Sequence, residues 1–252
     1  MVAQALIFVS VPRVNIAIRI DLARASRTGL ISSSAAYPTI WQRVRQALRW
    51  SKGRVQYFPG RLGQTEQSAL LGALREIIAD APLFTPTMPR SGNPMSVRMT
   101  NCGPLGWVTD KERGYRYQPT HPVTGKHWPP IPEILLDLWS EVADYPFAPE
   151  ACLVNYYSGD AKMGLHQDKD EEDFAAPVLS VSLGDTGIFR VGGASRKDPT
   201  QKIELKSGDV VVLGGDDRLA YHGIDRVVPG TSDLIAEGGR FNLTLRRVTT
   251  PS

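Results

Sequence analysis

Cysteine is scarce in this chain, and long apolar runs are missing from it. Its 252 residues include only two cysteines, Cys102 and Cys152, which form neither a CxxC pair nor a disulfide framework. Such usage fits a reducing compartment and buried free thiols, so we expect a cytoplasmic protein. No stretch approaches the roughly 20 apolar residues that a membrane-spanning helix needs, and we therefore expect no membrane partner.

Acidic residues are almost absent from residues 1–54. Eight arginines and one lysine there face a single acid, Asp21, for a net charge of +8, whereas the rest of the chain carries −5. This composition fits a targeting segment, a basic arm or an extension outside the fold. We expect a poorly ordered basic extension, although residues 39–50 also fit a short amphipathic helix. Residues 55–252 are then expected to form a single domain.

Two helices are predicted in the first half of that domain. One begins near Thr65 and ends at Pro82, and the other begins near Pro132 and runs past Val142. Residues 85–130 are rich in proline and glycine and suggest short strands on long loops. From residue 151 onward, short β-rich runs alternate with turn residues, which indicates an antiparallel double sheet. The predicted fold class is α+β, with the helices flanking the β core.

A histidine and an acid stand two residues apart in "NYYSGDAKMGLHQDKDEEDF". On a strand, His166 and Asp168 would point to one face, but such a pair alone is weak evidence for a metal site. His222, in "LAYHGIDRV", supplies a candidate third ligand on a later strand. Two histidines and one carboxylate form the facial triad of non-haem Fe(II) oxygenases.

Basic and polar residues alternate along "RFNLTLRR", near the end of the chain. Arg240, Asn242, Thr244 and Arg246 share one face of this predicted strand. That face is either solvated, or it lies inside the β core and binds the carboxylates of an anionic cosubstrate.

The order of these motifs resembles the AlkB family of Fe(II)/2-oxoglutarate-dependent dioxygenases. The resemblance covers roughly residues 85–250 and is carried by several segments in sequence. They are "MSVRMTNCGPLGW", "RGYRYQP", "NYYSGDAKMGLHQDKDE", "APVLSVSLG", "GGASRKDP", "SGDVVVLGGDDRLAYHGI" and "RFNLTLR". Two features depart from the family pattern: the segment between His222 and Arg240 looks one residue longer, and the first 50 residues have no recognisable counterpart.

The resemblance implies a fold and a set of site residues. The fold would be a double-stranded β-helix, or jelly roll, over residues 151–250, with a nucleotide-recognition region over 85–130. The implied metal ligands and catalytic residues are His166, Asp168 and His222. The implied 2-oxoglutarate pocket comprises Asn155, Tyr157, Arg240, Asn242 and Arg246. The implied substrate-side residues are Trp107, Tyr115, Asp170 and Arg196.

The resemblance also implies an activity. We expect oxidative dealkylation of N-alkylated bases of the 1-methyladenine and 3-methylcytosine type, using Fe(II), 2-oxoglutarate and O2. The products would be an aldehyde, succinate, CO2 and repaired single-stranded or flipped-base DNA, with RNA as a second substrate, and the enzyme would act as a monomer. Two alternatives stay open: the same chemistry on RNA, protein or another substrate, and a non-catalytic metal-binding β-barrel module.

Several polar residues near these motifs have a simpler expected role. Glu171, Glu172 and Asp173 are expected to form a solvated acidic loop. His121 and His127 lie in the turn-like stretch "HPVTGKHW", which suits a surface position or substrate contact.

Overall fold

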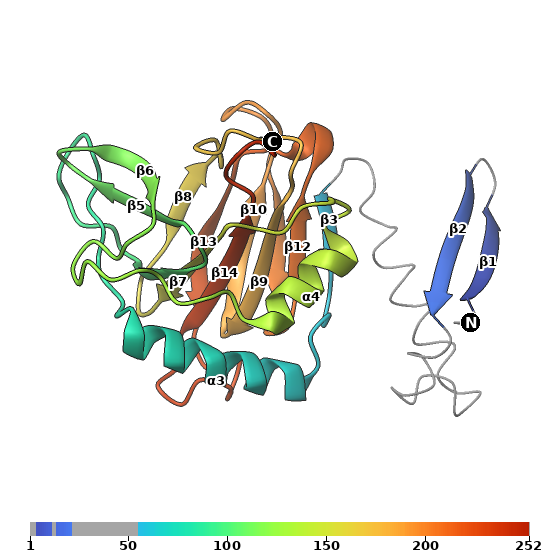
Figure 1. The fold of residues 1–252 in the computed structure, drawn as a ribbon, viewed down its shortest axis with the longest axis horizontal. Helices are drawn as coiled ribbons and strands as arrows, with labels where there is room; N and C mark the ends of the chain where they lie inside the picture. Colours follow the sequence, from blue (N-terminus) through green and yellow to red (C-terminus); the bar gives the residue numbers. More distant parts are fainter. Residues whose placement is uncertain (1–3, 12–13, 22–54, 252) are drawn as a thin grey trace. The chain divides into compact units, whose positions relative to one another are not determined.

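A computed structural model of the chain describes residues 4–11, 14–21 and 55–251 (Figure 1). The chain divides into two compact units, residues 1–48 and 49–252. In the first unit the described backbone is a hairpin of β1 (Gln4–Val11) and β2 (Val14–Asp21). The helix considered for residues 39–50 lies outside the described residues, and the expected poor order of residues 1–54 stays a prediction.

Two helices flank the β core of the second unit, as the sequence predicts. The first, α3, spans Gln64–Asp80 and presents buried leucines at Leu70, Leu71 and Leu74. Its first turn is closed by the Glu66 carboxylate, which accepts a hydrogen bond from the Gly63 amide at 2.7 Å. The second helix, α4, spans Glu133–Val142 and begins directly after Pro132. No helix in the described part of the chain is long and apolar enough to cross a membrane.

Two antiparallel sheets form the core, and the chain passes repeatedly from one to the other. The six-stranded major sheet has the order β3-β12-β9-β14-β7-β4, and the four-stranded minor sheet has the order β11-β10-β13-β8. The major strands are β3 (Val55–Phe58), β4 (Arg98–Cys102), β7 (Ala151–Tyr157), β9 (Val178–Gly184), β12 (Val210–Leu213) and β14 (Arg240–Arg246). The minor strands are β8 (Met163–His166), β10 (Thr186–Val191), β11 (Gln201–Leu205) and β13 (His222–Val228). This alternation confirms the jelly-roll core.

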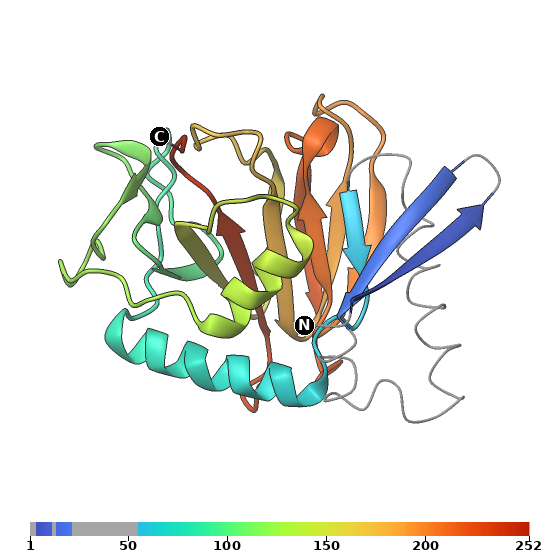
Figure 2. The ribbon, with the colours of Figure 1, turned by 45° about the vertical axis from the view of Figure 1, so that its right-hand side comes forward.

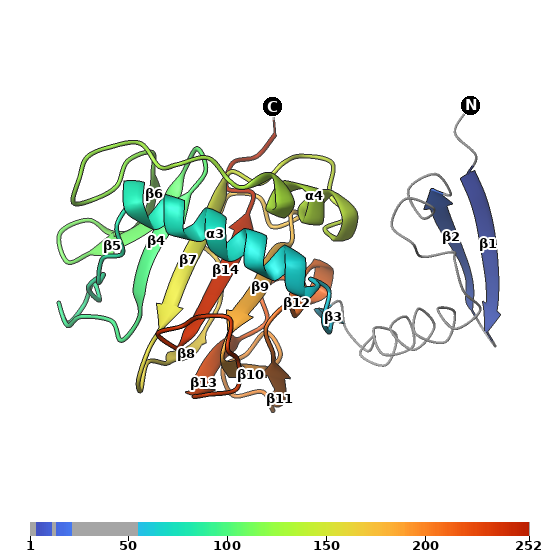
Figure 3. The ribbon, with the colours of Figure 1, turned by 90° about the horizontal axis from the view of Figure 1, so that it is seen from below.

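Both faces of the major sheet are covered, one by the helices and one by the minor sheet. Figures 2 and 3 show α3 and α4 on one side of the major sheet and β8, β10, β11 and β13 on the other. Along β9, Leu179, Val181 and Leu183 belong to the helix-side core, whereas Ser180 and Ser182 have the opposite parity. The face that looks toward the minor sheet therefore carries polar side chains in mid-sheet. Polar side chains are unusual at such positions in a core, and here they indicate a cavity that binds a ligand.

The region between the two helices divides into two structural parts. β4 pairs with β7 and so belongs to the major sheet. β5 (Gly106–Asp110) and β6 (Gly114–Gln118) form a separate hairpin, called here the β5–β6 hairpin. The short edge strand β3 was not predicted, since four residues ending in a turn carry little pattern of their own.

Candidate active site

The three predicted metal ligands lie together at one end of the minor sheet. His166 ends β8 and His222 begins β13, and the two residues are direct partners across the antiparallel pair. The strands approach closely because Gly223 has no side chain: a Cβ there would lie 2.5 Å from the Met163 carbonyl. Asp168 lies beyond the end of β8, so a loop, and not the alternation of a strand, brings its carboxylate to the histidines.

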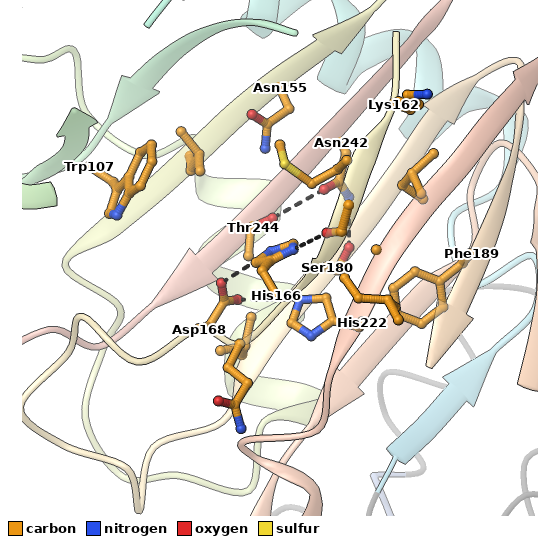
Figure 4. A pocket seen from close by; sticks show the side chains of 18 of the residues that line it. Trp107, Asn155, Lys162, His166, Asp168, Ser180, Phe189, His222, Asn242 and Thr244 are labelled. Atoms are coloured by element: carbon orange, nitrogen blue, oxygen red, sulfur yellow. Dashed lines mark hydrogen bonds and ion pairs between the residues drawn. The ribbon is translucent and has the colours of Figure 1, made fainter. Parts of the chain in front are cut away.

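The ligand atoms of His166, Asp168 and His222 lie within 4.8 Å of one another. Figure 4 shows the three side chains pointing toward a common centre. Nε2 of His166 is 3.7 Å from Asp168 Oδ1, and Nε2 of His222 is 3.8 Å from Asp168 Oδ2. Asp168 Oδ2 is buried and accepts no hydrogen bond from a described residue. Two imidazoles and an unsatisfied carboxylate oxygen suit a divalent transition metal with further positions open.

Backbone carbonyls orient both rings for this role. Nδ1 of His166 lies 2.9 Å from the Gly164 carbonyl oxygen, and Nδ1 of His222 lies 2.9 Å from the Ala220 carbonyl oxygen. A carbonyl can only accept, so each Nδ1 carries a proton, and in the neutral form of each ring Nε2 has a lone pair available for a metal. Burial, together with the charges of His166 and Arg246, lowers the pKa of His222 to about 4, against the opposing effect of Asp168. His222 is therefore a neutral imidazole at physiological pH.

Asp168 belongs to a buried cluster of four charged side chains, completed by Glu171, Arg218 and Arg246. Arg246 donates to Asp168 Oδ1 at 2.8 Å, and its Nε lies 3.5 Å from Glu171 Oε1. Arg218 pairs with Glu171 Oε2 at 3.0 Å and donates to the Asp168 carbonyl oxygen at 2.7 Å. Burial would raise the pKa of Asp168, but Arg246 and the two histidines outweigh it and hold that pKa well below its usual range. The carboxylate is thus ionised.

Arg240 has a different environment from Arg246. It is fully buried, and a Cβ at Gly187 on the facing sheet would lie 2.7 Å from its Nε. Its Nη2 donates to the Ser182 hydroxyl at 2.9 Å, and its guanidinium lies 5.4 Å from the centre of the Tyr157 ring. Its Nε and Nη1 are buried and donate to no described residue, and burial lowers its pKa. An unpaired buried guanidinium is costly, and an anionic ligand would complete it.

The other predicted cosubstrate residues surround Arg240. Asn155, Tyr157 and Asn242 line the same cavity, and the side-chain oxygen of Asn155 is buried without a hydrogen bond from a described residue. Asn242 donates to the Ser180 hydroxyl at 2.6 Å and accepts from Thr244 at 3.2 Å (Figure 4). The face carrying Arg240, Asn242, Thr244 and Arg246 is therefore turned inward, and the solvated alternative is wrong.

The β5–β6 hairpin forms one wall of the cavity. The rings of Trp107 and Tyr115 stack with their centres 5.5 Å apart, and Tyr115 is 49% exposed. The Trp107 indole donates to Asp170 Oδ2 at 2.8 Å, and Asp170 itself is exposed. The base of the hairpin is fixed because the Asn101 side chain bonds both the amide and the carbonyl of Trp107 at 3.0 Å.

A single cavity of about 640 Å³ connects all twelve predicted site residues. The exposed Arg196 lies at its rim, with the guanidinium 5.2 Å from the centre of the Tyr221 ring. Four of the five methionines also line it, at Met88, Met95, Met99 and Met163. Flexible thioether side chains give such a wall the ability to adapt to ligands of different shape.

Two expectations from the sequence are wrong, and both concern buried polar residues. Glu171 and Asp173 are 5% and 9% exposed, and each accepts a hydrogen bond from a tyrosine hydroxyl, Tyr117 and Tyr145 respectively. Only Glu172 of that run is exposed. His121 is 2% exposed, contacts the Pro82 carbonyl oxygen at 2.8 Å and belongs to the core, whereas His127 is exposed. The half-buried Tyr117 and the buried Glu171 and Arg218 had no signal in the sequence beyond their residue type.

Comparison with known proteins agrees with this geometry. Residues 54–246 match the model of the 2OG-Fe(II) oxygenase superfamily. The chain is 53% identical over 193 residues to an alpha-ketoglutarate-dependent dioxygenase AlkB homolog of Caulobacter vibrioides, covering 77% of this chain and 87% of that protein. It is 45% identical over 182 residues to the alpha-ketoglutarate-dependent dioxygenase AlkB of Escherichia coli, covering 71% and 83% respectively.

A solved structure shares the fold. The structure of OsALKBH1 superimposes with a TM-score of 0.67 at 32% identity, covering 79% of this chain and 98% of that one. The inward-facing triad, the unpaired buried arginine and these matches agree, and the chain belongs to the AlkB family of Fe(II)/2-oxoglutarate-dependent dioxygenases.

Proposed function

We propose that this dioxygenase repairs N-alkylated bases of the 1-methyladenine and 3-methylcytosine type in single-stranded DNA or in flipped-out nucleotides, with RNA as a second substrate. One observation supports this most directly. A single cavity joins the histidine–carboxylate triad, the unpaired Arg240 and an aromatic pair beside an exposed carboxylate. The aromatic pair offers a face for stacking a base, and a duplex would hide the target atom unless the base leaves the stack.

We further propose a role for each group of residues. His166, Asp168 and His222 would hold Fe(II), and Arg240, with Asn155, Tyr157, Asn242 and Arg246, would bind 2-oxoglutarate. When bound, iron with 2-oxoglutarate and O2 supplies the oxidant that hydroxylates the N-alkyl carbon, with succinate and CO2 as co-products. The protein supplies orientation and a dry cavity.

The substrate side would be formed by Trp107, Tyr115, Asp170 and Arg196. A ring methylated at N1 of adenine or N3 of cytosine is cationic, so Trp107 would attract it through stacking and cation–π contact. Asp170 would add a carboxylate that also accepts a hydrogen bond from the exocyclic amino group. Arg196, at the rim, would face the phosphate backbone.

The wider setting of this activity is also a proposal. Residues 55–252 would form the dioxygenase domain and residues 1–54 a basic extension, and the enzyme would act as a cytoplasmic monomer. The two buried free cysteines fit that compartment. A non-catalytic metal-binding module is disfavoured because it would have no use for a buried guanidinium without an acidic partner among the described residues.

The direct test is the release of both products. With Fe(II), 2-oxoglutarate and O2, the protein should release formaldehyde and succinate in equal amounts from an oligonucleotide containing 1-methyladenine, and Asp168→Ala should release neither. Methylated DNA and RNA, single- and double-stranded, are compared with unmethylated strands. Succinate without formaldehyde from the methylated strands would mean that 2-oxoglutarate is oxidised without demethylation and would contradict the proposed substrate. No succinate at all would contradict the proposed activity.

Arg240 should be essential for the cosubstrate and dispensable for the fold. We expect Arg240→Ala to raise the KM for 2-oxoglutarate about 30-fold or more, since truncating one partner of a buried charge pair costs at least about 2 kcal/mol. The free energy of unfolding without 2-oxoglutarate should not fall by a similar amount, because the arginine is unpaired there. Arg190→Ala, on the outer face of the minor sheet, is the control. An unchanged KM in Arg240→Ala would remove Arg240 from the cosubstrate pocket.

The metal-free protein should lose stability between about pH 6.5 and pH 4 because of His222. Its pKa in the folded state is about 4, against 6.5 for an ordinary histidine. Below pH 6.5 the unfolded chain binds a proton at this residue while the folded chain does not, so acid favours unfolding. The full difference is about 3 kcal/mol at 1.36 kcal/mol per pKa unit. We measure the free energy of unfolding in urea, with a chelator present, across this pH range. The loss of stability in His222→Gln should be smaller than in the wild-type protein by about that amount. Parallel pH profiles of the two proteins would contradict a buried neutral imidazole.

Asp170 should select for cationic lesions through its charge. We expect Asp170→Asn, which keeps an acceptor for the Trp107 indole, to lower kcat/KM for 1-methyladenine and 3-methylcytosine about tenfold, because a hydrogen bond to a charged group contributes about 1.5 kcal/mol. The neutral lesions 1-methylguanine and 3-methylthymine should change little, and Glu172→Gln should leave all four unchanged. Equal losses for cationic and neutral lesions would leave Asp170 without a role in selection.

A further inference from the structure

The β5–β6 hairpin is joined by two neighbouring hydrogen bonds to the loop that follows Asp168. Trp107 of β5 and Tyr117 of β6 are direct partners across the hairpin. The Trp107 indole donates to Asp170, and the Tyr117 hydroxyl donates to Glu171, the next residue. One cross-strand aromatic pair thus binds two consecutive acids of the loop that follows Asp168.

The bond between Tyr117 and Glu171 belongs to a chain of contacts that includes Arg246 and Asp168. The Tyr117 hydroxyl also accepts a hydrogen bond from Arg246 Nη1 at 3.1 Å, while Arg246 Nη2 donates to Asp168 Oδ1 at 2.8 Å. Burial and the charge of Glu171 raise the pKa of Tyr117, although Arg246 acts in the opposite direction, so the hydroxyl keeps its proton. One hydroxyl therefore links the hairpin to the arginine that orients a metal ligand.

Moving the Tyr117 hydroxyl away from Glu171 and Arg246 would cost free energy. Glu171 is 5% exposed and Arg246 is 6% exposed, so water cannot readily replace the hydroxyl on either. If the hairpin moved away, a buried carboxylate and a buried guanidinium would each lose a partner. The position of the hairpin and the position of Arg246 are therefore not independent.

We propose that Tyr117, acting through Glu171 and Arg246, is a positioning residue that couples nucleic-acid binding at the hairpin to 2-oxoglutarate binding beside the metal. The inference rests on the proposed function, which places the base against Trp107 and the cosubstrate against Arg240 and Arg246. A base that fixes the hairpin also fixes Tyr117 and hence Arg246. By thermodynamic reciprocity, 2-oxoglutarate in turn tightens the binding of the nucleic acid.

A matched pair of variants separates coupling from stability. Tyr117→Phe removes the hydroxyl and keeps the ring. Tyr145→Phe removes an equivalent bond, from a tyrosine hydroxyl to Asp173 in the same acidic segment, and that acceptor is joined to neither Arg246 nor Asp168 by any interaction of the described residues. Both variants lose a hydrogen bond to a buried carboxylate, but only the first breaks the link to the site.

The experiment measures the Kd of 2-oxoglutarate on the full-length, Fe(II)-loaded protein by anaerobic calorimetry, with and without a single strand containing 1-methyladenine. We expect the strand to lower that Kd at least about fivefold in the wild-type protein and in Tyr145→Phe. In Tyr117→Phe the two Kd values should agree within about twofold. If Tyr117→Phe does not fold, Glu171→Gln, which removes the charge shared with Arg246, should show the same loss of coupling.

The possible failures are distinguishable. Wild-type protein that binds neither 2-oxoglutarate nor the methylated strand contradicts the proposed function itself. Binding of both with no effect of one on the other, or a wild-type ratio retained in Tyr117→Phe, contradicts only the coupling. An equal loss of coupling in Tyr117→Phe and Tyr145→Phe would assign the effect to a general loss of rigidity in the protein and would also overturn the role of Tyr117.

Discussion

The active site depends on a buried, balanced set of four charges. Asp168, Glu171, Arg218 and Arg246 are each at most 6% exposed. Moving such groups out of water costs several kcal/mol each, so every one of them needs its partners in place. Arg246 comes from β14, the two acids from the loop after β8, and Arg218 from the segment that leads into His222. The geometry of the metal ligands is therefore held largely by residues that do not ligate the metal.

The part of the cavity around Arg240 is electrostatically unlike this balanced set of charges. Arg246 contacts two carboxylates, whereas Arg240 contacts a serine hydroxyl and an aromatic ring, and two of its nitrogens bond to no described residue. Stability alone would favour an acidic partner for this arginine, or an apolar residue in its place. One strand thus carries two buried arginines with different partners: Arg246 pairs with two acids of the protein, whereas Arg240 has no acidic partner among the described residues.

Features that follow from the alternation of residues along one strand were predictable from the sequence. Contacts between residues far apart in the chain were not. The period-two pattern predicted that Arg240, Asn242 and Thr244 share a face, but only the pairing of β14 with β7 and β9 turns that face inward. Acids in one run look alike, yet Glu171 is buried because Arg218 lies beside it from 47 residues further along the chain. The four-residue β3 is defined by its partner β12 and hardly by its own residues.

The two acids that bond to the β5–β6 hairpin, Asp170 and Glu171, differ in their exposure to solvent. Glu171 is buried, with one carboxylate oxygen accepting from Arg218 and the other from Tyr117, so a ligand cannot reach it. Asp170 is exposed and accepts one hydrogen bond, from Trp107, among the described residues. A carboxylate accepts about four hydrogen bonds, so Asp170 could accept a further bond from the base that we propose binds there without losing its bond to the indole. The two consecutive acids therefore differ in role: buried Glu171 fixes the hairpin to the loop after Asp168, and exposed Asp170 stays accessible from the cavity.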